Sequence, residues 1–304
     1  MRSLFARLHN LLVHPGPFPS RRCCSKRARC QTNTMADVVI LGCGYTGGRV
    51  AAVLERQGYT VQGYRRREGF DCRNHAQLRA IRDGTTPETR VLLSVPTLRT
   101  DAGYWFDPTR DLIAAVRGAR RLVYLSTTGV YGATKRVDEH TPVSPRGPRE
   151  LLRVEAERAV LAEPRSMVLR PAAIYGPFRG VHTALREGRF ALPSDCQAFT
   201  SRIHVDDLAA LTAAALLSDA GGAWPVADEE PCTALEIATF CAELLSLPLP
   251  PVVAAERLPE TRRTDRKVDG SAVRRVLDVT LRYRSYREGI PASIAEEQSV
   301  AETG

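Results

Sequence analysis

Apolar and polar positions follow one another along this chain in blocks that predict strands and helices in regular alternation. The run Val38-Val39-Ile40-Leu41 is continuously apolar, as in a strand that is buried on both faces. Beyond it, Val50, Val53 and Leu54 recur at helical spacing, and Gly58 marks the end of that helix. The expected elements are strands over 38–41, 60–64, 90–96, 121–125 and 167–170, separated by helices over 49–57, 75–83, 112–116 and 150–163.

This succession favours an α/β fold with a doubly wound parallel sheet, the Rossmann fold. In such a sheet, ligands gather at the carboxyl ends of the strands. From Phe178 onward the predicted elements are shorter and richer in Pro and Gly, which indicates a small C-terminal substrate lobe. We therefore expect an NAD(P)-binding Rossmann core over 35–177 and a C-terminal part over 178–304 that partly completes the core and partly forms this lobe.

The first strand leads directly into the pattern Gly42-x-Gly44-x-x-Gly47, followed by a helix and a second strand. This is the arrangement that a dinucleotide site requires. The first glycine makes a tight turn, the second lets the backbone approach a pyrophosphate, and the third lets helix and strand pack closely. The alternative is a plain glycine turn. The residues that we expect to contact the cofactor, here and at the following strand ends, are Gly42, Gly44, Tyr45, Thr46, Gly47, Val95, Pro96 and Ser126.

The end of the second strand indicates which nucleotide binds. An NAD site normally carries a carboxylate about 20 residues past the first glycine. Here the chain has Tyr64-Arg65-Arg66-Arg67, and the first acid afterwards is Glu68. Guanidinium groups fork onto phosphate oxygens, so we predict NADP rather than NAD, with Arg65 and Arg66 on the 2′-phosphate. The alternative is a solvated basic loop.

The charge balance of the 304-residue chain does not indicate a nucleic-acid partner. The formal charge is +9, but residues 1–34 hold seven Lys and Arg residues and no acid, and without them 36 basic residues face 34 acidic ones. We expect this leader to be disordered, or to reflect a start codon assigned upstream of Met35. Import into an organelle through it is the alternative to a cytoplasmic location. We expect no membrane partner, because no apolar run approaches the ~18 residues of a spanning helix.

The eight cysteines are scattered and none forms a C-x-x-C, so the sequence predicts a reducing compartment and no metal site.

Several motifs together resemble the extended short-chain dehydrogenase/reductase superfamily, in its NAD-dependent epimerase/dehydratase branch. The resemblance runs from about Ala36 to about Ile290. The motifs that carry it are Gly42-x-Gly-x-x-Gly47, Tyr124-Leu-Ser-Thr-Thr-Gly-Val-Tyr-Gly132, Arg170-Pro-Ala-Ala-Ile-Tyr-Gly-Pro177, Arg202-Ile-His-Val-Asp-Asp-Leu208 and Val226-Ala-Asp-Glu-Glu-Pro231.

The resemblance implies a catalytic hydroxyl at Thr127 and a Tyr-x-x-x-Lys pair on the next helix. In this chain that pair falls on Arg149 and Arg153, with Glu157 matching a downstream Glu of the family. An arginine stays protonated, so Arg149 cannot take over the proton transfer of a tyrosine phenol. The two arginines are expected to present cations on one helical face, toward a phosphate, a carboxylate or a developing oxyanion. The alternative is a solvated face on which Arg149 pairs with Glu150 and Arg153 with Glu157.

Other candidates are weaker. Tyr131 and Tyr175 are expected to be structural rather than catalytic. Arg202 is a candidate for a substrate phosphate by resemblance, or else a surface charge. We expect His204 to be packed, and Asp206 and Asp207 to cap a helix that begins at Leu208. The cluster of Arg262, Arg263, Arg266 and Lys267 is expected to form a solvated face, with contact to an anionic substrate or nucleotide as the alternative.

The sequence thus predicts an NADP-binding oxidoreductase or epimerase/dehydratase for a small anionic carbonyl or sugar-derived substrate. Its catalytic set would be non-standard: Thr127 with Arg149 and Arg153. The alternative is a non-catalytic protein that senses NADP(H), which accounts for the missing tyrosine. A homodimer through core helices is an expectation at the level of the family.

Overall fold

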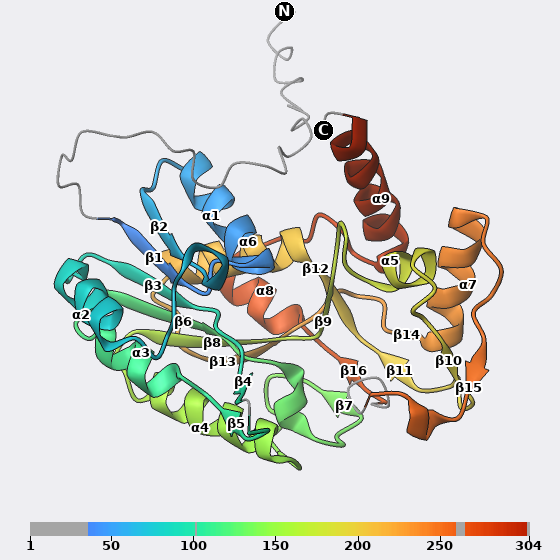
Figure 1. The fold of residues 1–304 in the computed structure, drawn as a ribbon, viewed down its shortest axis with the longest axis horizontal. Coiled ribbons are helices and arrows are strands. Elements are labelled where there is room, and N and C mark those ends of the chain that lie inside the picture. Colours follow the sequence, from blue (N-terminus) through green and yellow to red (C-terminus); the bar gives the residue numbers. More distant parts are fainter. Residues whose placement is uncertain (1–35, 101, 260–264, 303–304) are drawn as a thin grey trace, which may run out of the picture.

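The computed structural model describes residues 36–100, 102–259 and 265–302, so the leader over 1–34 lies outside the described residues. Its centre is a sheet of six parallel strands in the order β13-β8-β6-β3-β1-β2 (Figure 1). The bounds of these strands are Val38–Leu41 for β1, Val61–Tyr64 for β2, Arg90–Leu93 for β3, Arg121–Leu125 for β6, Ser166–Pro171 for β8 and Gly222–Val226 for β13. The predicted doubly wound parallel sheet is confirmed.

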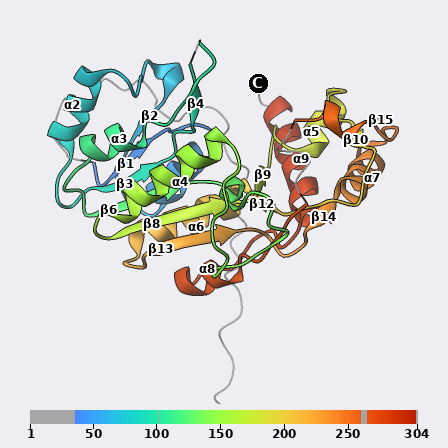
Figure 2. The same ribbon diagram turned by 90° about the horizontal axis from the view of Figure 1, so that it is seen from below.

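Helices cover both faces of this sheet (Figures 1 and 2). Val38 and Ile40 of β1 point into the cluster with helices α1, α6 and α8, whereas Val39 and Leu41 point into the cluster with α2, α3 and α4. A strand with both faces covered needs apolar residues at every position, which explains the unbroken run. These helices are α1 (Tyr45–Arg56), α2 (His75–Gly84), α3 (Thr109–Ala115), α4 (Pro148–Leu161), α6 (Val205–Leu217) and α8 (Ser271–Leu277).

The order of the strands places a topological switch point between β1 and β3. From β1 the chain passes to β2 on one side, then crosses back to β3 on the other. Ligands of open α/β sheets bind beyond the carboxyl ends of the strands at such a point. The glycine turn that follows β1 lies there.

The C-terminal part contributes to both regions of the molecule. Its strand β13 completes the central sheet beside β8, and α6 covers one face. The remaining elements gather into a lobe beside the sheet, with an apolar core that includes Phe190, Ile237 and Ile290 (Figure 2). This lobe contains β9 (Ala173–Tyr175), α5 (Val181–Arg186), β10 (Leu192–Pro193), β11 (Phe199–Thr200), β12 (Arg202–His204), β14 (Cys232–Thr233), α7 (Ala234–Leu245), β15 (Val252–Val253), η3 (Ala255–Arg257) and α9 (Tyr286–Glu302).

Charged side chains join this lobe to the core. Arg49 of α1 forms ion pairs with Asp206 at 2.6 Å and with Glu296 of α9 at 2.7 Å. On the same helix, buried Glu297 accepts hydrogen bonds from His182 and Arg186. Burial opposes ionisation of Glu297, yet these hydrogen bonds lower its pKa to about 2. The contacts fix α9 against both halves of the chain.

Short elements that the apolar pattern does not predict lie near the carboxyl edge of the sheet. They are the hairpin of β4 (Leu98–Arg99) and β5 (Trp105–Phe106), the turns η1 (Arg66–Glu68) and η2 (Thr128–Tyr131), and the parallel pair β7 (Arg136–Val137) and β16 (Lys267–Val268). The third strand is shorter than expected, because β3 ends at Leu93 and Ser94 to Pro96 continue as irregular chain. No helix in the described ranges is long and apolar enough to cross a membrane.

Candidate functional site

The glycine turn after β1 gives each of its three glycines a different environment. A Cβ added to Gly42, whose φ is +99°, would lie 2.6 Å from the backbone of Ser94 on β3's extension. A Cβ on Gly47 would lie 2.7 Å from the carbonyl oxygen of Gly42. At Gly44, by contrast, an added Cβ meets nothing within 4 Å. The turn therefore packs tightly against the sheet at Gly42 and Gly47 and leaves open space in front of Gly44, where a pyrophosphate would approach the first turn of α1.

The two residues after Gly44 differ in how they are placed. Thr46 is buried in α1. The hydroxyl of Tyr45 donates a 3.0 Å hydrogen bond to the carbonyl of Pro177, and the guanidinium of Arg179 lies 5.2 Å from its ring centre. Tyr45 thus links the glycine turn to the loop after β9.

The basic segment lies directly after β2, as the sequence predicts. Arg65 continues the strand in extended conformation, and Arg66 is exposed at the start of η1. The guanidinium of Arg65 forms an ion pair with Glu68, which lies half-exposed on the same turn. A 2′-phosphate at this place would compete with the Glu68 carboxylate for Arg65.

Val95 and Pro96 follow β3 at the same edge. Val95 is buried and its carbonyl accepts a 3.3 Å hydrogen bond from Arg153, whereas Pro96 is exposed.

A buried network occupies the position that we predicted for Ser126. The hydroxyl of Ser126 donates to Glu157, whose carboxylate also accepts from Nε and Nη2 of Arg170, the latter at 2.7 Å. Nη1 of Arg170 donates at 3.0 Å to the hydroxyl of Tyr131, whose ring is fully buried. Ser126 and Tyr131 therefore serve the packing of α4 against β6 and β8 in this structure.

Unlike Ser126, Thr127 has a hydroxyl that does not belong to the buried network. It is half-buried, and its Oγ1 accepts a 3.1 Å hydrogen bond from the backbone N–H of Gly129 as the cap of η2. Because this bond uses only a lone pair, the O–H of Thr127 can still donate to a bound group.

Arg149 and Arg153 do not share one environment, contrary to the expected pair of cations on one face. Arg149 is exposed at the start of α4, with its guanidinium 5.7 Å from the ring centre of Trp105. Arg153 is buried, donates to the hydroxyl of Tyr124 and lies 3.6 Å from the Asp107 carboxylate.

Neither pairing of the solvated alternative is present, although Arg149 itself is exposed. Glu150 accepts from the backbone N–H groups of Arg146 and Gly147, which caps α4, and Glu157 belongs to Arg170. The sequence could not distinguish these outcomes, because the partners of both arginines come from distant segments.

The three tyrosines of the motifs after β6 and β8 and at the end of β6 lie in the interior. Tyr124 and Tyr131 are fully buried, and the hydroxyl of Tyr175 donates at 3.1 Å to the Ser285 carbonyl. Burial raises the pKa of Tyr124 to about 12, against the positive charge of Arg153. None of these three phenols stands where a proton donor for a substrate would.

Arg202 is buried rather than a surface charge. Its Nη1 donates to the carbonyl of Thr200 at 2.8 Å and contacts the sulfur of Cys232 at 2.9 Å. Asp228 is buried near it, and burial raises the pKa of this carboxyl to about 8 against the opposing charge of Arg202. Both hydrogen-bond contacts of this side chain lie within the lobe, where Arg202 holds β12 beside β11 and β14.

The residue expected to cap α6 needs correction. His204, not Asp206 or Asp207, caps α6, because its ring accepts from the Asp206 N–H at 3.2 Å; burial and the charge of Arg49 lower the pKa of His204 to about 3.

Within the basic cluster, Arg266 is buried rather than solvated. It donates to the carbonyls of Thr128, Gly132 and Thr134, which holds η2. Arg262 and Arg263 lie outside the described residues. Lys267 lies over the ring of Phe199.

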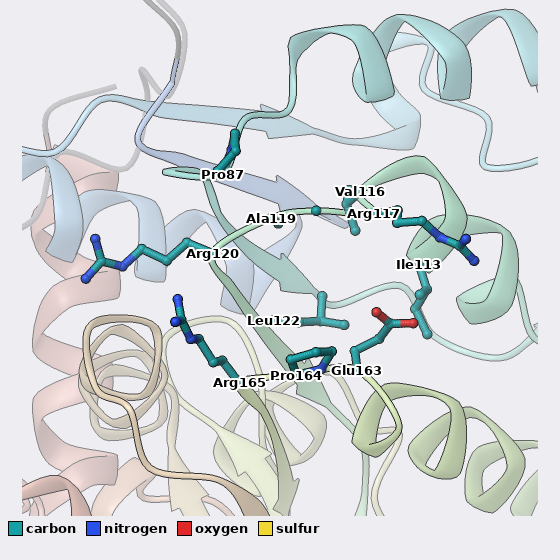
Figure 3. Close-up of a pocket in the computed structure, with 11 residues that line it drawn as sticks. Pro87, Ile113, Val116, Arg117, Ala119, Arg120, Leu122, Glu163, Pro164 and Arg165 are labelled. Carbon is teal, nitrogen blue, oxygen red and sulfur yellow. The ribbon is translucent and has the colours of Figure 1, made fainter.

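Two cavities lie elsewhere. The first, of about 400 Å³, is lined by Ile113, Leu122, Arg165 and their neighbours at the amino ends of the strands, opposite to the glycine turn (Figure 3). The second, of about 500 Å³, lies between β7, β16 and α8. Neither is lined by the glycine turn, so we place the site by backbone geometry rather than by cavity size. In the described ranges no three His, Cys, Asp or Glu side chains are grouped to hold a metal.

The comparisons with known proteins agree with this geometry. The family model described as "NAD dependent epimerase/dehydratase family" matches residues 38–227. A 3-diazoavenalumate denitrifying reductase from a Streptomyces species is 33% identical over 201 residues, which span 60% of this chain and 62% of that protein. The chain thus spans less than two thirds of this curated relative.

Two solved structures illustrate the likeness of the fold. A conserved protein of unknown function from Silicibacter pomeroyi is 31% identical, with a TM-score of 0.67 over 85% of this chain and 98% of that one. The UDP-glucose 4-epimerase of Thermus thermophilus, solved with NAD, is 20% identical with a TM-score of 0.72 over 86% and 99% of the two chains. On the family match and this fold, the chain belongs to the NAD-dependent epimerase/dehydratase family of the extended short-chain dehydrogenase/reductase superfamily.

Proposed function

We propose that this protein is an NADP-dependent reductase of a small anionic substrate, with a carbonyl or sugar-derived compound as the substrate class. The observation that carries the proposal is the open space in front of Gly44, at the switch point of the sheet and beside Arg65 and Arg66. The family supports a nicotinamide cofactor, and the residues of the turn fit one. When bound, the nicotinamide supplies or accepts a hydride.

The burial of the Tyr124, Tyr131 and Tyr175 hydroxyls favours reduction over the epimerase and dehydratase reactions. Oxidising a substrate alcohol requires a base for its hydroxyl proton, and neither Arg149 nor a buried tyrosine can serve as one. Reducing a carbonyl requires a hydride at carbon and a proton at oxygen, and water can deliver that proton. The curated relative, named a denitrifying reductase, also supports the reductive direction.

In this proposal, Thr127 donates its O–H to the substrate oxygen and holds it toward the cofactor. Arg149 supplies the positive charge that an anionic substrate meets at the mouth of the site. Arg153 acts from beneath, because its guanidinium holds the Val95 carbonyl and the Tyr124 hydroxyl in place at the strand ends. Ser126 and Arg202 support the site through their buried contacts.

Replacing Thr127 with alanine should abolish most turnover without changing coenzyme affinity. A lost hydrogen bond to a developing oxyanion typically costs a factor of about 10² to 10³ in kcat. The measurement is NADPH oxidation at 340 nm against a panel of small carbonyl compounds, with Thr127→Ser as the matched control that keeps the hydroxyl. Equal rates in Thr127→Ala and the unaltered protein would contradict the assigned role.

The double change Arg65→Ala and Arg66→Ala should weaken NADPH binding by roughly tenfold or more while NADH binding changes little, since only NADPH carries the 2′-phosphate. Glu68→Gln should act in the opposite direction, because it removes the carboxylate that competes for Arg65. Titration by the quenching of protein fluorescence gives both affinities. Parallel losses for the two coenzymes would refute the phosphate assignment and point to NAD.

The second candidate function is a non-catalytic sensor of NADP(H), and the burial of Tyr124, Tyr131 and Tyr175 favours it. Tight coenzyme binding without turnover on any substrate of the panel would support the sensor. We further propose a small-molecule partner, a homodimer and the cytoplasm as the setting. The scattered cysteines support the cytoplasm, with organelle import through 1–34 as the alternative.

A further inference from the structure

The hairpin of β4 and β5 places an aromatic pair at the carboxyl edge of the sheet. It begins five residues after the end of β3 and lies against the start of α4 (Figure 1). Tyr104 is 74% exposed and Trp105 is 38% exposed. The stem is held by the side chain of Arg99, whose Nε donates at 3.0 Å to the Gly103 carbonyl. Large aromatic side chains left in solvent at a site's edge are typical of ligand contacts.

Arg149 adds a charge to this aromatic pair. Its guanidinium lies 5.7 Å from the ring centre of Trp105, within the range of a cation–π interaction, and that of Arg99 lies 5.8 Å from the same ring. No carboxylate among the described residues pairs with Arg149, and Glu150, the nearest acid in sequence, is occupied as the helix cap. Arg149 therefore retains a charge that the protein itself does not neutralise.

A cation–π contact at this distance leaves the N–H groups of the guanidinium available to donate to another group. Those N–H groups form a planar fork that matches the two oxygens of a carboxylate. An arginine held beside an aromatic ring without an acidic partner is thus suited to bind a planar anion. Arg153, the other arginine of the helix, is buried against Tyr124 and Asp107 and cannot fulfil this role.

We propose that Trp105 positions Arg149 to bind the carboxylate of a planar, conjugated substrate, whose flat part lies along Tyr104 and Trp105. The inference rests on the proposed function and specifies its substrate class. Trp105 is a positioning residue, and Arg149 is the group that touches the substrate. Arginine replaces the family's tyrosine at this position, so this chain exchanges a proton donor for an anion contact.

The test uses the full chain saturated with NADP⁺, with cinnamate as the probe and cinnamamide as its neutral counterpart. The chain has two tryptophans, so a Trp224→Phe background makes the emission of Trp105 a direct signal, and calorimetry on the unaltered chain repeats the titration. Cinnamate should bind and change that emission. Cinnamamide should bind at least roughly tenfold more weakly than cinnamate, as expected for the loss of a charged hydrogen bond. Phenyl phosphate tests whether a phosphate is preferred.

Arg149→Met should weaken cinnamate roughly tenfold or more and leave NADP⁺ affinity unchanged. Trp105→Ala should weaken it several-fold, and Trp105→Phe, which keeps an aromatic face, should restore it. Arg79→Met, on the exposed face of α2, is the matched control and should have no effect. Equal binding of acid and amide, a preference for the phosphate, unaltered affinity in Arg149→Met, or no cinnamate binding to NADP⁺-loaded protein would overturn the inference alone. Failure of NADP⁺ itself to bind would overturn the proposed function and this inference with it.

Discussion

In a Gly44→Ala variant, the affinity for NADPH should fall by roughly a hundredfold or more, about 2.7 kcal/mol, while thermal stability falls much less than in a Gly42→Ala variant. The reason is that an added Cβ at Gly44 meets no protein atom within 4 Å, so the methyl group enters only the space assigned to the pyrophosphate. Its φ of −90° lies outside the left-handed region that favours glycine, but its ψ of −140° lies outside the main helical and extended regions, so the change adds some backbone strain. Calorimetric titration and a melting curve measure the two quantities.

Gly42→Ala is the control for this prediction, because its defect should lie in folding. The φ of +99° and the 2.6 Å approach to Ser94 both oppose a side chain there. We expect a loss of stability of more than the roughly 1–2 kcal/mol that a left-handed backbone alone costs. If Gly44→Ala bound NADPH normally, or if it unfolded as Gly42→Ala does, the open space would not be the coenzyme's place.

The second large effect concerns the buried network of α4. Arg170→Met should destabilise the protein by about 3–5 kcal/mol, because it leaves the Glu157 carboxylate buried with only the Ser126 hydroxyl as a partner. This corresponds to a decrease in Tm of roughly 10 °C. Differential scanning calorimetry measures it. Tyr131→Phe, which removes one hydroxyl at the edge of the same network, should cost only about 1 kcal/mol.

A double variant separates the lost ion pair from the lost packing. Glu157→Met together with Arg170→Met leaves no charge in the interior, so it should recover part of the stability that Arg170→Met loses. A double variant as unstable as the sum of the two single changes would show that packing, and not an unpaired carboxylate, is responsible.

The sequence was sufficient for the features that depend on local pattern. The apolar run at 38–41 and the glycine spacing after it predict a buried strand and a dinucleotide turn, and the parallel sheet is as expected. The strand predicted over 90–96 was too long. Ser94 and Val95 are small or apolar and so continue the strand pattern, but the regular strand ends before them. The hairpin over 98–106 was missed because each of its strands has only two residues, too few for a period of two to be recognised.

The surroundings of Arg149 and Arg153 could not be predicted from local pattern. Arg149 and Arg153 are one helical turn apart, and spacing alone puts them on one face. What separates them is a hairpin about 45 residues earlier, whose Trp105 ring lies near the guanidinium of Arg149, and the strand residue Tyr124, which accepts from Arg153. His204 caps α6 where Asp206 and Asp207 were expected, because the helix begins at Val205 and both aspartates lie inside its first turn. Long-range partners decided the two arginine cases, and an earlier helix start decided the cap.

The central claim is that a dinucleotide with a 2′-phosphate binds across the glycine turn at the start of α1. Isothermal titration calorimetry of the full chain with NADPH and with NADH tests it most directly. The account predicts one site per chain, a tighter complex with NADPH, and the loss of that complex in Gly44→Ala. Absence of binding heat with both coenzymes, or an NADPH complex that Gly44→Ala leaves intact, would contradict it.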